Sequence, residues 1–374
     1  MKKFSIIKEG SINLVLNNNF PKISKGIEKK ISSIWEKNSK DNVRLENNRI
    51  LFLQRINEYN NTIEVGFADY KTFFAKYHNK KLGIKISPIG VSGLTIMGDK
   101  NSRMILFGKR SSTVTQYPNY LELVPSGHLD ESAVSKAGKI EHKKKVLQEL
   151  EEETPLSRKY IKNISALCLV KDENHDAYDI CYEIETNFTV KKFNKSNIPS
   201  DEYSELILIP EKNLKRFSRN EKIVPTSLAI IDYYLKIKQI TLTAVSKKDI
   251  RFLYNLLEWR DPNVNISHKK MPTYSEHIQF VLSKPYSKWY IIKFNNQKAG
   301  TIYLSKNNEI GIFLKPNMQG KRIGDIALKR LMELNSRERF LANISPMNVR
   351  SQKFFQDRGF KLIQYTYEYV DENN

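Results

Sequence analysis

The chain has 374 residues, 40% of them hydrophobic, so it is long enough for two or three compact cores. No run approaches the roughly 20 apolar residues that a membrane span needs, and the first residues contain no secretory leader, so we expect a cytoplasmic protein without a membrane partner. The formal net charge of +21 is compatible with nucleic-acid binding. However, the lysines are scattered over both halves of the chain, which argues against nucleic acid and suits anionic small molecules.

The first 80 residues contain one predicted pair of strands and no recognisable chemistry. The strands are expected at 49–55 and 62–67, with a hairpin turn at Asn60-Asn61. We interpret residues 1–80 as an extra layer or lid on the domain that follows.

Strands and helices alternate between residues 81 and 239. Strands are predicted at 86–97, 103–109, 120–124, 164–171, 179–184 and 206–209, with a turn at 98–101 between the first two. Helices are predicted at 141–153, ended by Pro155, and at 225–238. Cys168 and Cys181 could face each other on neighbouring strands, and a cytosolic protein favours two buried reduced thiols.

A second pattern begins near residue 240. Strands are predicted at 240–244, 289–294, 299–304, 310–314 and 340–344, and helices at 249–259, 325–334 and 350–358. A hairpin turn is expected at Asn295-Asn296. We therefore predict an α/β (α+β) protein with an N-terminal extension, 1–80, and two domains, 81–239 and 240–374.

Four carboxylates crowd into residues 149–153 of the first predicted helix. At about 3.6 residues per turn, Glu149, Glu152 and Glu153 share one face. Like charges this close destabilise a helix unless a cation neutralises them, and Mg²⁺ or Mn²⁺ takes oxygen ligands of this kind. A metal held there can bridge phosphate oxygens and activate a water. The alternative is a solvated acidic helix.

The surrounding residues resemble the Nudix box of pyrophosphohydrolases. The matching positions are Gly127, Gln148, Glu149, Leu150, Glu152, Glu153, Pro155 and Leu156. The Gly127-His128 loop resembles the branch that cleaves UDP-hexoses. The resemblance implies an α/β/α sandwich with a mixed sheet over about residues 80–238, and substrate contacts from Gly127 and His128. It also implies a metal held by Glu149, Glu152 and Glu153, with Glu152 and Glu153 catalytic.

This segment departs from the Nudix pattern in three places. Gln148 stands where the family has Arg, Pro155 stands where it has Gly, and about seven extra residues separate Gly127 from Gln148. The general base is open between the glutamates and an acid within 172–176. The segment is therefore compatible with an active hydrolase or with a binding module.

A second candidate site lies at residues 316–324, between an apolar strand and an amphipathic helix. Such a loop exposes backbone N–H groups at a helix N-terminus, which suits a pyrophosphate, and Lys321 and Arg322 add positive charge. The loop resembles the acetyl-CoA loop of GNAT acetyltransferases. Gln319 and Gly324 match that loop, whereas Arg322 replaces a glycine.

Residues 348–360 resemble the Asn-x-x-Ser-x-x-aromatic-aromatic segment of the same family. Together the two motifs imply a GNAT fold over about residues 240–370 with acetyl-CoA as cofactor. The implied cofactor contacts are Gln319, Gly320, Lys321, Arg322, Ile323, Gly324, Asn348, Ser351 and Phe355. The family often has a tyrosine acid where Phe355 stands, so Ser351 or a water is the alternative acid. Glu309 is the candidate base, and its alternative is a surface glutamate.

The acceptor is suggested by residues 257–264 and by Glu276-His277. They resemble the GNAT branch that acetylates the 4-amino group of a UDP-linked amino sugar on the pseudaminic acid pathway, although ribosomal-protein acetyltransferases carry a similar pattern. The implied acceptor contacts are Trp259, Arg260 and His277. Core packing for Trp259 and polar surface positions for His268 and His277 are the alternatives.

The two resemblances together predict a bifunctional nucleotide-sugar enzyme. It would acetylate a UDP-4-amino-4,6-dideoxy sugar with acetyl-CoA and, with Mg²⁺, cut the product to UMP and a sugar 1-phosphate. Two alternatives are open: a protein N-acetyltransferase fused to a housekeeping Nudix hydrolase, and a non-catalytic nucleotide-sugar sensor. The oligomeric state is open as well.

Overall fold

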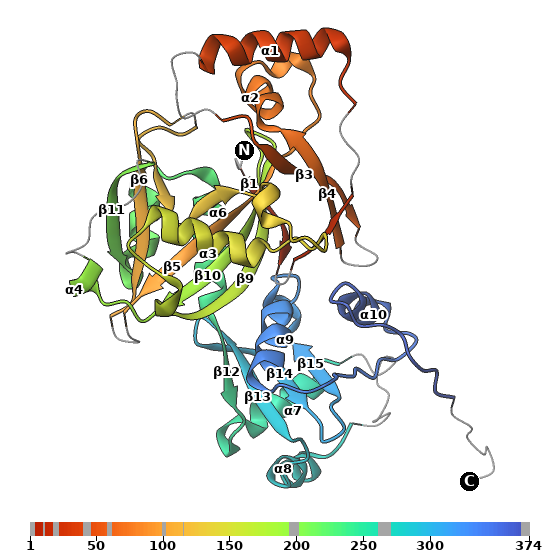
Figure 1. Cartoon of the computed structure of the whole chain (residues 1–374). Helices are drawn as coiled ribbons and strands as arrows, with labels where there is room; N and C mark the ends of the chain where they lie inside the picture. Colours follow the sequence, from red (N-terminus) through yellow and green to blue (C-terminus); the bar gives the residue numbers. More distant parts are fainter. Residues whose placement is uncertain are drawn as a thin grey trace. The chain divides into compact units, whose positions relative to one another are not determined.

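The structure, a computed structural model, forms two compact units, Met1–Leu235 and Lys236–Asn374 (Figure 1). It describes residues 4–9, 12–17, 22–39, 46–57, 62–98, 102–114, 116–193, 202–260 and 271–367. The predicted turn residues 60–61 and 99–101, the acceptor residues 261–264 and His268 lie outside these ranges. Within them, no helix is long and apolar enough to cross a membrane.

An eight-stranded mixed sheet is the core of the first unit, and it confirms the predicted α/β class. Its order is β1-β9-β10-β5-β6-β11, with β7 paired to β6 and β8 to β5. The strands are β1 (Phe4–Glu9), β5 (Ile89–Met97), β6 (Met104–Arg110), β7 (Leu121–Leu123), β8 (Ser126–His128), β9 (Ile161–Asp172), β10 (Ala177–Thr186) and β11 (Tyr203–Pro210). Every residue of β5 is buried, because β5 runs through the middle of the sheet parallel to β10.

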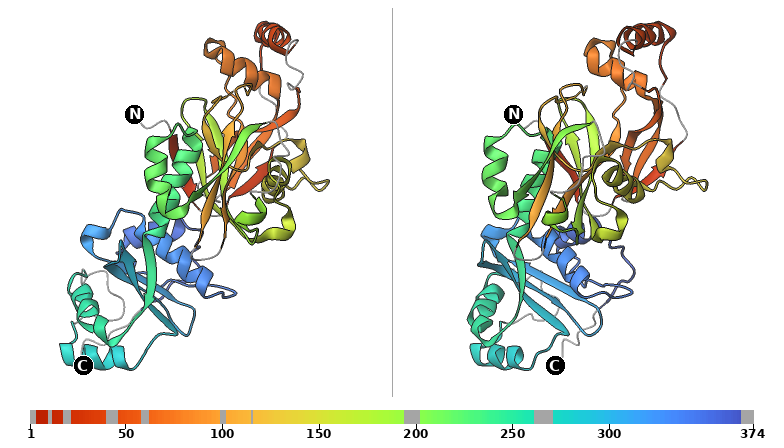
Figure 2. Two further views of the ribbon diagram at one scale, coloured as in Figure 1. Left: turned by 90° about the vertical axis from the view of Figure 1, so that its left-hand side faces the viewer. Right: turned by 60° about the vertical axis from the view of Figure 1, so that its left-hand side comes forward.

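Helices cover both faces of this sheet (Figure 2). The helices that follow the strands are α3 (His142–Glu153), α4 (Val190–Phe193), α5 (Leu214–Asn220) and α6 (Pro225–Lys238). Helix α3 buries Val146 and Leu150 against the sheet, which leaves its glutamates toward β8 and solvent. Cys168 on β9 and Cys181 on β10 are register partners, and both are buried and free, which confirms the prediction of reduced thiols.

The N-terminal segment forms a smaller layer and also joins the main sheet. Its elements are β2 (Asn13–Leu16), α1 (Lys25–Ser39), β3 (Arg49–Asn57), β4 (Thr62–Asp69) and α2 (Tyr70–His78), with the strands in the order β2-β4-β3. Strand β1 lies outside this layer, antiparallel to β9. The two helices were not predicted, although the spacing of Ile27, Ile31 and Ile34 carries a helical signal, and these side chains pack in the layer's core.

The second unit is built on a four-stranded antiparallel sheet. Its strands follow chain order: β12 (Ile240–Ala244), β13 (Lys288–Phe294), β14 (Gln297–Leu304) and β15 (Ile310–Leu314). Its helices are α7 (Ile250–Glu258), α8 (Tyr274–Leu282), α9 (Ile323–Leu334) and α10 (Val349–Gln356). Asn295 and Asn296 make the predicted turn between β13 and β14, with φ of 49° and 62°.

The strand predicted at 340–344 is wrong. This segment makes only an isolated parallel bridge between Glu309 and Leu341. Its alternate apolar residues Phe340, Ala342 and Ile344 pack against the core beneath α9. The alternation that predicted a strand is therefore satisfied by burial without a hydrogen-bonded ladder.

Candidate functional site

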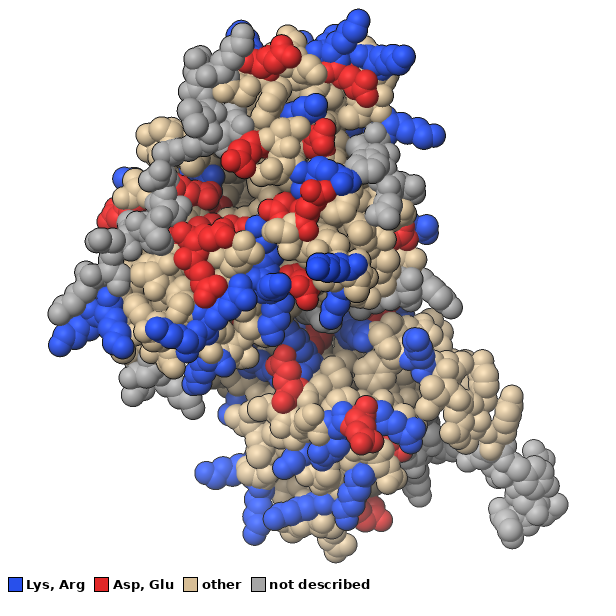
Figure 3. Space-filling model, viewed as in Figure 1, with Lys and Arg blue, Asp and Glu red and all other residues tan. Residues whose placement is uncertain are grey.

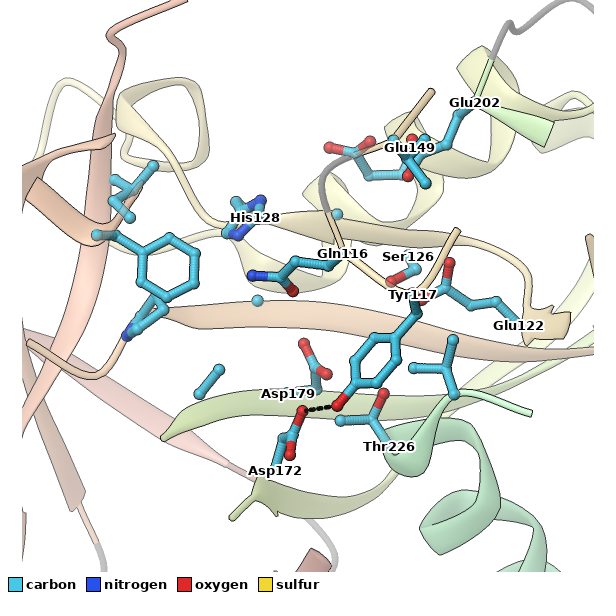
Figure 4. A pocket seen from close by; sticks show the side chains of 18 of the residues that line it. Gln116, Tyr117, Glu122, Ser126, His128, Glu149, Asp172, Asp179, Glu202 and Thr226 are labelled. Carbon is cyan, nitrogen blue, oxygen red and sulfur yellow. Dashed lines mark hydrogen bonds between the residues drawn. The ribbon is translucent and has the colours of Figure 1, made fainter. Parts of the chain in front are cut away.

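A cavity of about 680 Å³ opens in the first unit beside α3 (Figure 4). Seven carboxylates line it: Glu46, Glu122, Asp130, Glu149, Asp172, Asp179 and Glu202. Aromatic side chains form other parts of its wall: Tyr70, Phe73, Tyr117 and Tyr178. Arg110 is the one Lys or Arg among the described lining residues. The cavity is therefore rich in hydrogen-bond acceptors and ring faces and poor in positive charge.

The predicted substrate residues Gly127 and His128 lie at this cavity together with Glu149. A Cβ atom at Gly127 would come 2.4 Å from Cδ of Glu149, so the absence of a side chain at Gly127 lets α3 bring Glu149 against β8. The His128 ring contacts Tyr70 and Phe73, with centroids 5.7 and 6.1 Å away.

The structure does not bring the three glutamates of α3 together. Glu149 pairs with Nζ of Lys145 at 2.9 Å, and the exposed Glu152 accepts a hydrogen bond from Nε2 of Gln148 at 2.8 Å. Glu153 is 3% exposed and accepts a hydrogen bond from the backbone N–H of Ser126 at 3.2 Å. Glu149 and Glu153 are one turn apart, whereas Glu152 is rotated toward solvent.

These positions give the predicted ligands a poor fit to a divalent cation. Nowhere in the described part of the chain do three His, Cys, Asp or Glu side chains stand in position to hold a metal ion. Burial and the neighbouring Glu202 and Glu149 carboxylates raise the pKa of Glu153 well above its usual range. Burial also raises the pKa of Glu202 to about 7, although Arg110 opposes the shift. Both shifts favour the protonated forms of these two carboxyl groups.

Two side-chain networks at the cavity were missed by the sequence analysis. Arg110 forms ion pairs with Glu122 and, at 3.1 Å, with Glu202. These residues come from β6, from β7 and from the residue before β11, so no local spacing relates them.

The second network joins Tyr117, Asp172 and His175. The Tyr117 hydroxyl donates to Oδ2 of Asp172 at 2.8 Å, and Nδ1 of His175 lies 2.7 Å from the same oxygen. Tyr117 has a left-handed φ of 50°, which is rare for an aromatic residue. Of the three, only Asp172 was in the range of acids that the sequence singled out. Figure 4 shows Asp172 and Asp179 across the cavity from Glu149 and Glu202.

The predicted acetyl-CoA loop lies between β15 and α9 in the second unit. Gly320 and Arg322 adopt left-handed φ angles of 71° and 61°, and α9 begins at the next residue, Ile323. The first N–H groups of a helix have no partner inside the helix, so they can receive a phosphate oxygen. Gly324 packs closely against α10, because a Cβ atom there would be 3.2 Å from the Phe354 ring. The loop therefore has a conformation that can present main-chain N–H groups to an anion.

Other predicted cofactor residues shape this loop through bonds within the protein. Nε2 of Gln319 donates to the backbone oxygen of Leu314 at 3.1 Å, and Arg350 donates to Oε1 of Gln319 at 2.6 Å. Asn348 caps α10 by accepting from the backbone N–H of Ser351 at 3.0 Å. Phe355 is 5% exposed and belongs to the core of the unit. Lys321 is exposed and leaves its charge free for a ligand.

The predicted base, Glu309, precedes β15. Its Oε2 accepts from the Ser305 hydroxyl and its Oε1 from Nδ2 of Asn343, both at 2.9 Å. Both carboxylate oxygens therefore have protein partners, and each keeps a lone pair for a further donor.

The three predicted acceptor residues lie in different environments. Trp259 ends α7, is 46% exposed and has Nζ of Lys315 5.9 Å from its ring. The guanidinium of Arg260 lies 4.9 Å from the Phe313 ring centroid. His277 is 3% exposed, and its Nε2 lies 3.2 Å from the backbone oxygen of Ile250, so it joins α8 to α7 inside the unit. Burial lowers the pKa of His277, which makes it a neutral structural group.

Solved structures with partial similarity cover each half of the protein. The NUDIX domain of Shewanella oneidensis NrtR, complexed with ADP ribose, is 18% identical, with 44% of this chain and 94% of that chain covered and a TM-score of 0.32. The spermidine/spermine N-acetyltransferase SpeG from Vibrio cholerae is 16% identical, with 33% and 80% covered and a TM-score of 0.29. The ribosomal L7/L12 alpha-N-protein acetyltransferase RimL, in complex with coenzyme A, is 20% identical, with 34% and 82% covered and a TM-score of 0.30. These values are too low to support an argument about function.

The sequence comparisons are more specific for the second unit. No curated protein matches the chain. The family model described as "Acetyltransferase (GNAT) family" matches residues 251–360, which run from the second residue of α7 to beyond the end of α10 and include the loop before α9. The second unit therefore contains an acetyltransferase domain of the GNAT family.

Proposed function

We propose that the second unit transfers the acetyl group of acetyl-CoA to the 4-amino group of a UDP-4-amino-4,6-dideoxy sugar, as on the pseudaminic acid pathway. The observation that carries the acetyl-transfer part is the family match over residues 251–360, with the loop before α9 in a suitable conformation. Bound acetyl-CoA supplies a thioester carbon that an amine can attack.

The residues of the loop would hold the diphosphate of the cofactor. The first N–H groups of α9 have no partner inside the helix and can receive phosphate oxygens, and Lys321 and Arg322 provide positive charge. Gln319 ties the loop to β15 and, through Arg350, to α10, so the loop is held before the cofactor arrives. The attacking amine must lose a proton, and Glu309 remains our candidate base.

The acceptor is inferred from the charge around the end of α7. Arg260 and Lys315 lie beside the rings of Phe313 and Trp259. Cations backed by aromatic rings favour an acceptor with a phosphate and a base that can stack. A polyamine is a cation, so the charges of Arg260 and Lys315 would repel it. This observation supports a nucleotide-linked amine over the rival protein or polyamine acceptors.

An acceptor panel tests this proposal. Acetyl-CoA consumption would be followed with a UDP-4-amino sugar, the same sugar without its nucleotide, a peptide and spermidine. The UDP-linked sugar should be preferred, and Arg260→Ala should raise its KM by at least about tenfold because a charged hydrogen bond is worth roughly 1.5–3 kcal/mol. Lys306→Ala, at an exposed position, is the matched control. Preference for the peptide or for spermidine would refute this acceptor.

For the first unit, the sequence predicts Mg²⁺-dependent hydrolysis of the UDP-sugar to UMP and sugar 1-phosphate. The separate partners of Glu149, Glu152 and Glu153 favour the alternative that the unit binds a nucleotide sugar without cutting it. UMP release with Mg²⁺ or Mn²⁺, abolished by Glu153→Gln, would establish hydrolysis instead. Absence of UMP from a preparation that binds the sugar nucleotide supports the binding role.

A further inference from the structure

Lys145 occupies a position between carboxylates of the cavity. Its side chain is 7% exposed, and its Nζ lies 3.0 Å from Oδ2 of Asp130 and 2.9 Å from Oε1 of Glu149. The hydroxyl of Ser132 is 3.4 Å away. Lys145 precedes Glu149 by four residues on α3, so helix geometry directs its ammonium to the Glu149 carboxylate.

The other carboxylates of the cavity also have partners within the protein. Arg110 pairs with Glu122 and Glu202, and the hydroxyl of Tyr117 donates to Asp172. The Thr226 side chain is hydrogen-bonded to Asp179. The exposed Glu46 accepts a hydrogen bond from Nδ2 of Asn48 at 3.2 Å, so each of the seven lining carboxylates has a described partner. A metal ion at this cavity would therefore have to compete with partners that the protein itself supplies.

We infer that Lys145 takes the place of a metal ion at Glu149, so that the cavity binds the hydroxyl groups and ring of a sugar or nucleoside without a divalent cation. A cation that captured Glu149 would have to displace Lys145 and leave its buried ammonium with a single carboxylate. A buried ammonium that loses one of its two carboxylate partners is strongly destabilised. This inference rests on the proposed binding role of the first unit and adds its ligand class and its independence of metal.

The chemistry of the cavity wall identifies the ligand class. Each paired carboxylate keeps lone pairs that can accept hydrogen bonds from hydroxyl groups. The half-buried ring of Tyr70 provides an apolar face for a sugar or a base. A phosphate inside the cavity would meet seven carboxylates, while Arg110 is already engaged, so the phosphates are expected outside it. A hydroxyl-rich, uncharged ring satisfies these conditions.

Titration of the full-length protein with Mn²⁺ alone, followed by electron paramagnetic resonance, tests the metal part. The wild type should show no saturable site that Glu149→Gln removes, whereas Lys145→Met should gain one because Asp130 and Glu149 lose their ammonium. Lys144→Ala, whose side chain is 61% exposed, should behave as wild type. A saturable site in the wild type that Glu149→Gln removes overturns the inference.

Ligand binding tests the remaining part. Calorimetry with uridine and with UDP-N-acetylglucosamine would be run in EDTA and again in MgCl₂. Affinity should be the same in both buffers, and Asp172→Asn should weaken it about tenfold, the value of one charged hydrogen bond. Affinity that requires Mg²⁺ overturns the inference while the binding role stands. If neither probe binds in either buffer, the binding role of the first unit is refuted, whatever the outcome of the Mn²⁺ titration.

Discussion

Single residues set the shape of the cavity, and Gly127 is the clearest case. Replacing it by alanine would place Cβ 2.4 Å from Cδ of Glu149, so the carboxylate must move away from β8 and from Lys145. We expect Gly127→Ala to lower the free energy of unfolding by about 1–3 kcal/mol, measured by urea denaturation. Gly26→Ala on α1, with nothing within 4 Å, is the control and should be neutral or slightly stabilising. An unchanged midpoint for Gly127→Ala would contradict the close packing.

Asp179 is expected to make the stability of the first unit depend on pH. Burial raises its pKa to about 7, whereas an unfolded aspartate titrates near about 4. The folded state therefore binds this proton more tightly than the unfolded state does. The resulting contribution to the free energy of unfolding is present below about pH 4 and is lost as the pH rises to about 7. Relative to Asp179→Asn, the wild type should lose up to about 1.4 kcal/mol per pH unit across that window.

Urea midpoints at several pH values would measure this difference. Asp232→Asn, at an exposed position on α6, is the matched control, and its pH profile should follow the wild type. Parallel profiles for Asp179→Asn and wild type would show that the carboxyl is not desolvated.

At the scale of elements, the cap of α10 links stability to cofactor binding. Asn348 accepts from the N–H of Ser351, and α10 places Phe354 against Gly324 at the start of α9. Asn348→Ala should cost about 1 kcal/mol of stability and weaken coenzyme A binding by less than tenfold, measured by denaturation and calorimetry. Asn307→Ala, an exposed turn residue, is the control. If Asn348→Ala were as stable as the wild type, the Asn348 cap would not contribute to the stability of this unit.

Most elements were predictable because their periodicity is local. The predicted helices at 141–153, 225–238 and 325–334 correspond to α3, α6 and α9 within two residues at either end. The strand predicted at 340–344 from alternating apolar residues is wrong, because burial of those side chains alone accounts for the pattern. Helix α8 was missed although Thr273 and Glu276 form a capping box, the signal that could have located its start.

At the scale of the whole molecule, each unit has its own core and its own candidate site. We therefore expect the two functions to be separable in the intact chain. Glu149→Gln should leave the kcat and KM of acetyl transfer unchanged, and Lys321→Ala should leave binding of UDP-N-acetylglucosamine in EDTA unchanged while weakening coenzyme A. A loss of acetyl transfer in Glu149→Gln would show that the sites are coupled.

Positive and negative charges are distributed differently over the molecule. Lysine and arginine side chains are spread over most of the face shown in Figure 3 and form no single stripe. The net charge of +21 coexists with a cavity lined by seven carboxylates. The net charge of the whole chain therefore does not describe the environment of this cavity.

The sequence by itself determined the periodic elements, the mixed class and the loop before α9, because each depends on residues within a few positions of one another. Only the tertiary structure decided the character of the cavity, since its walls come from α2, α3, several strands of the main sheet and the loop after β6. The spacing of Glu149, Glu152 and Glu153 predicted a common face. In the folded protein, however, Glu153 is buried and Glu152 is exposed. Lys145 pairs with Asp130, 15 positions away, and a contact of that kind depends on how the chain folds back on itself.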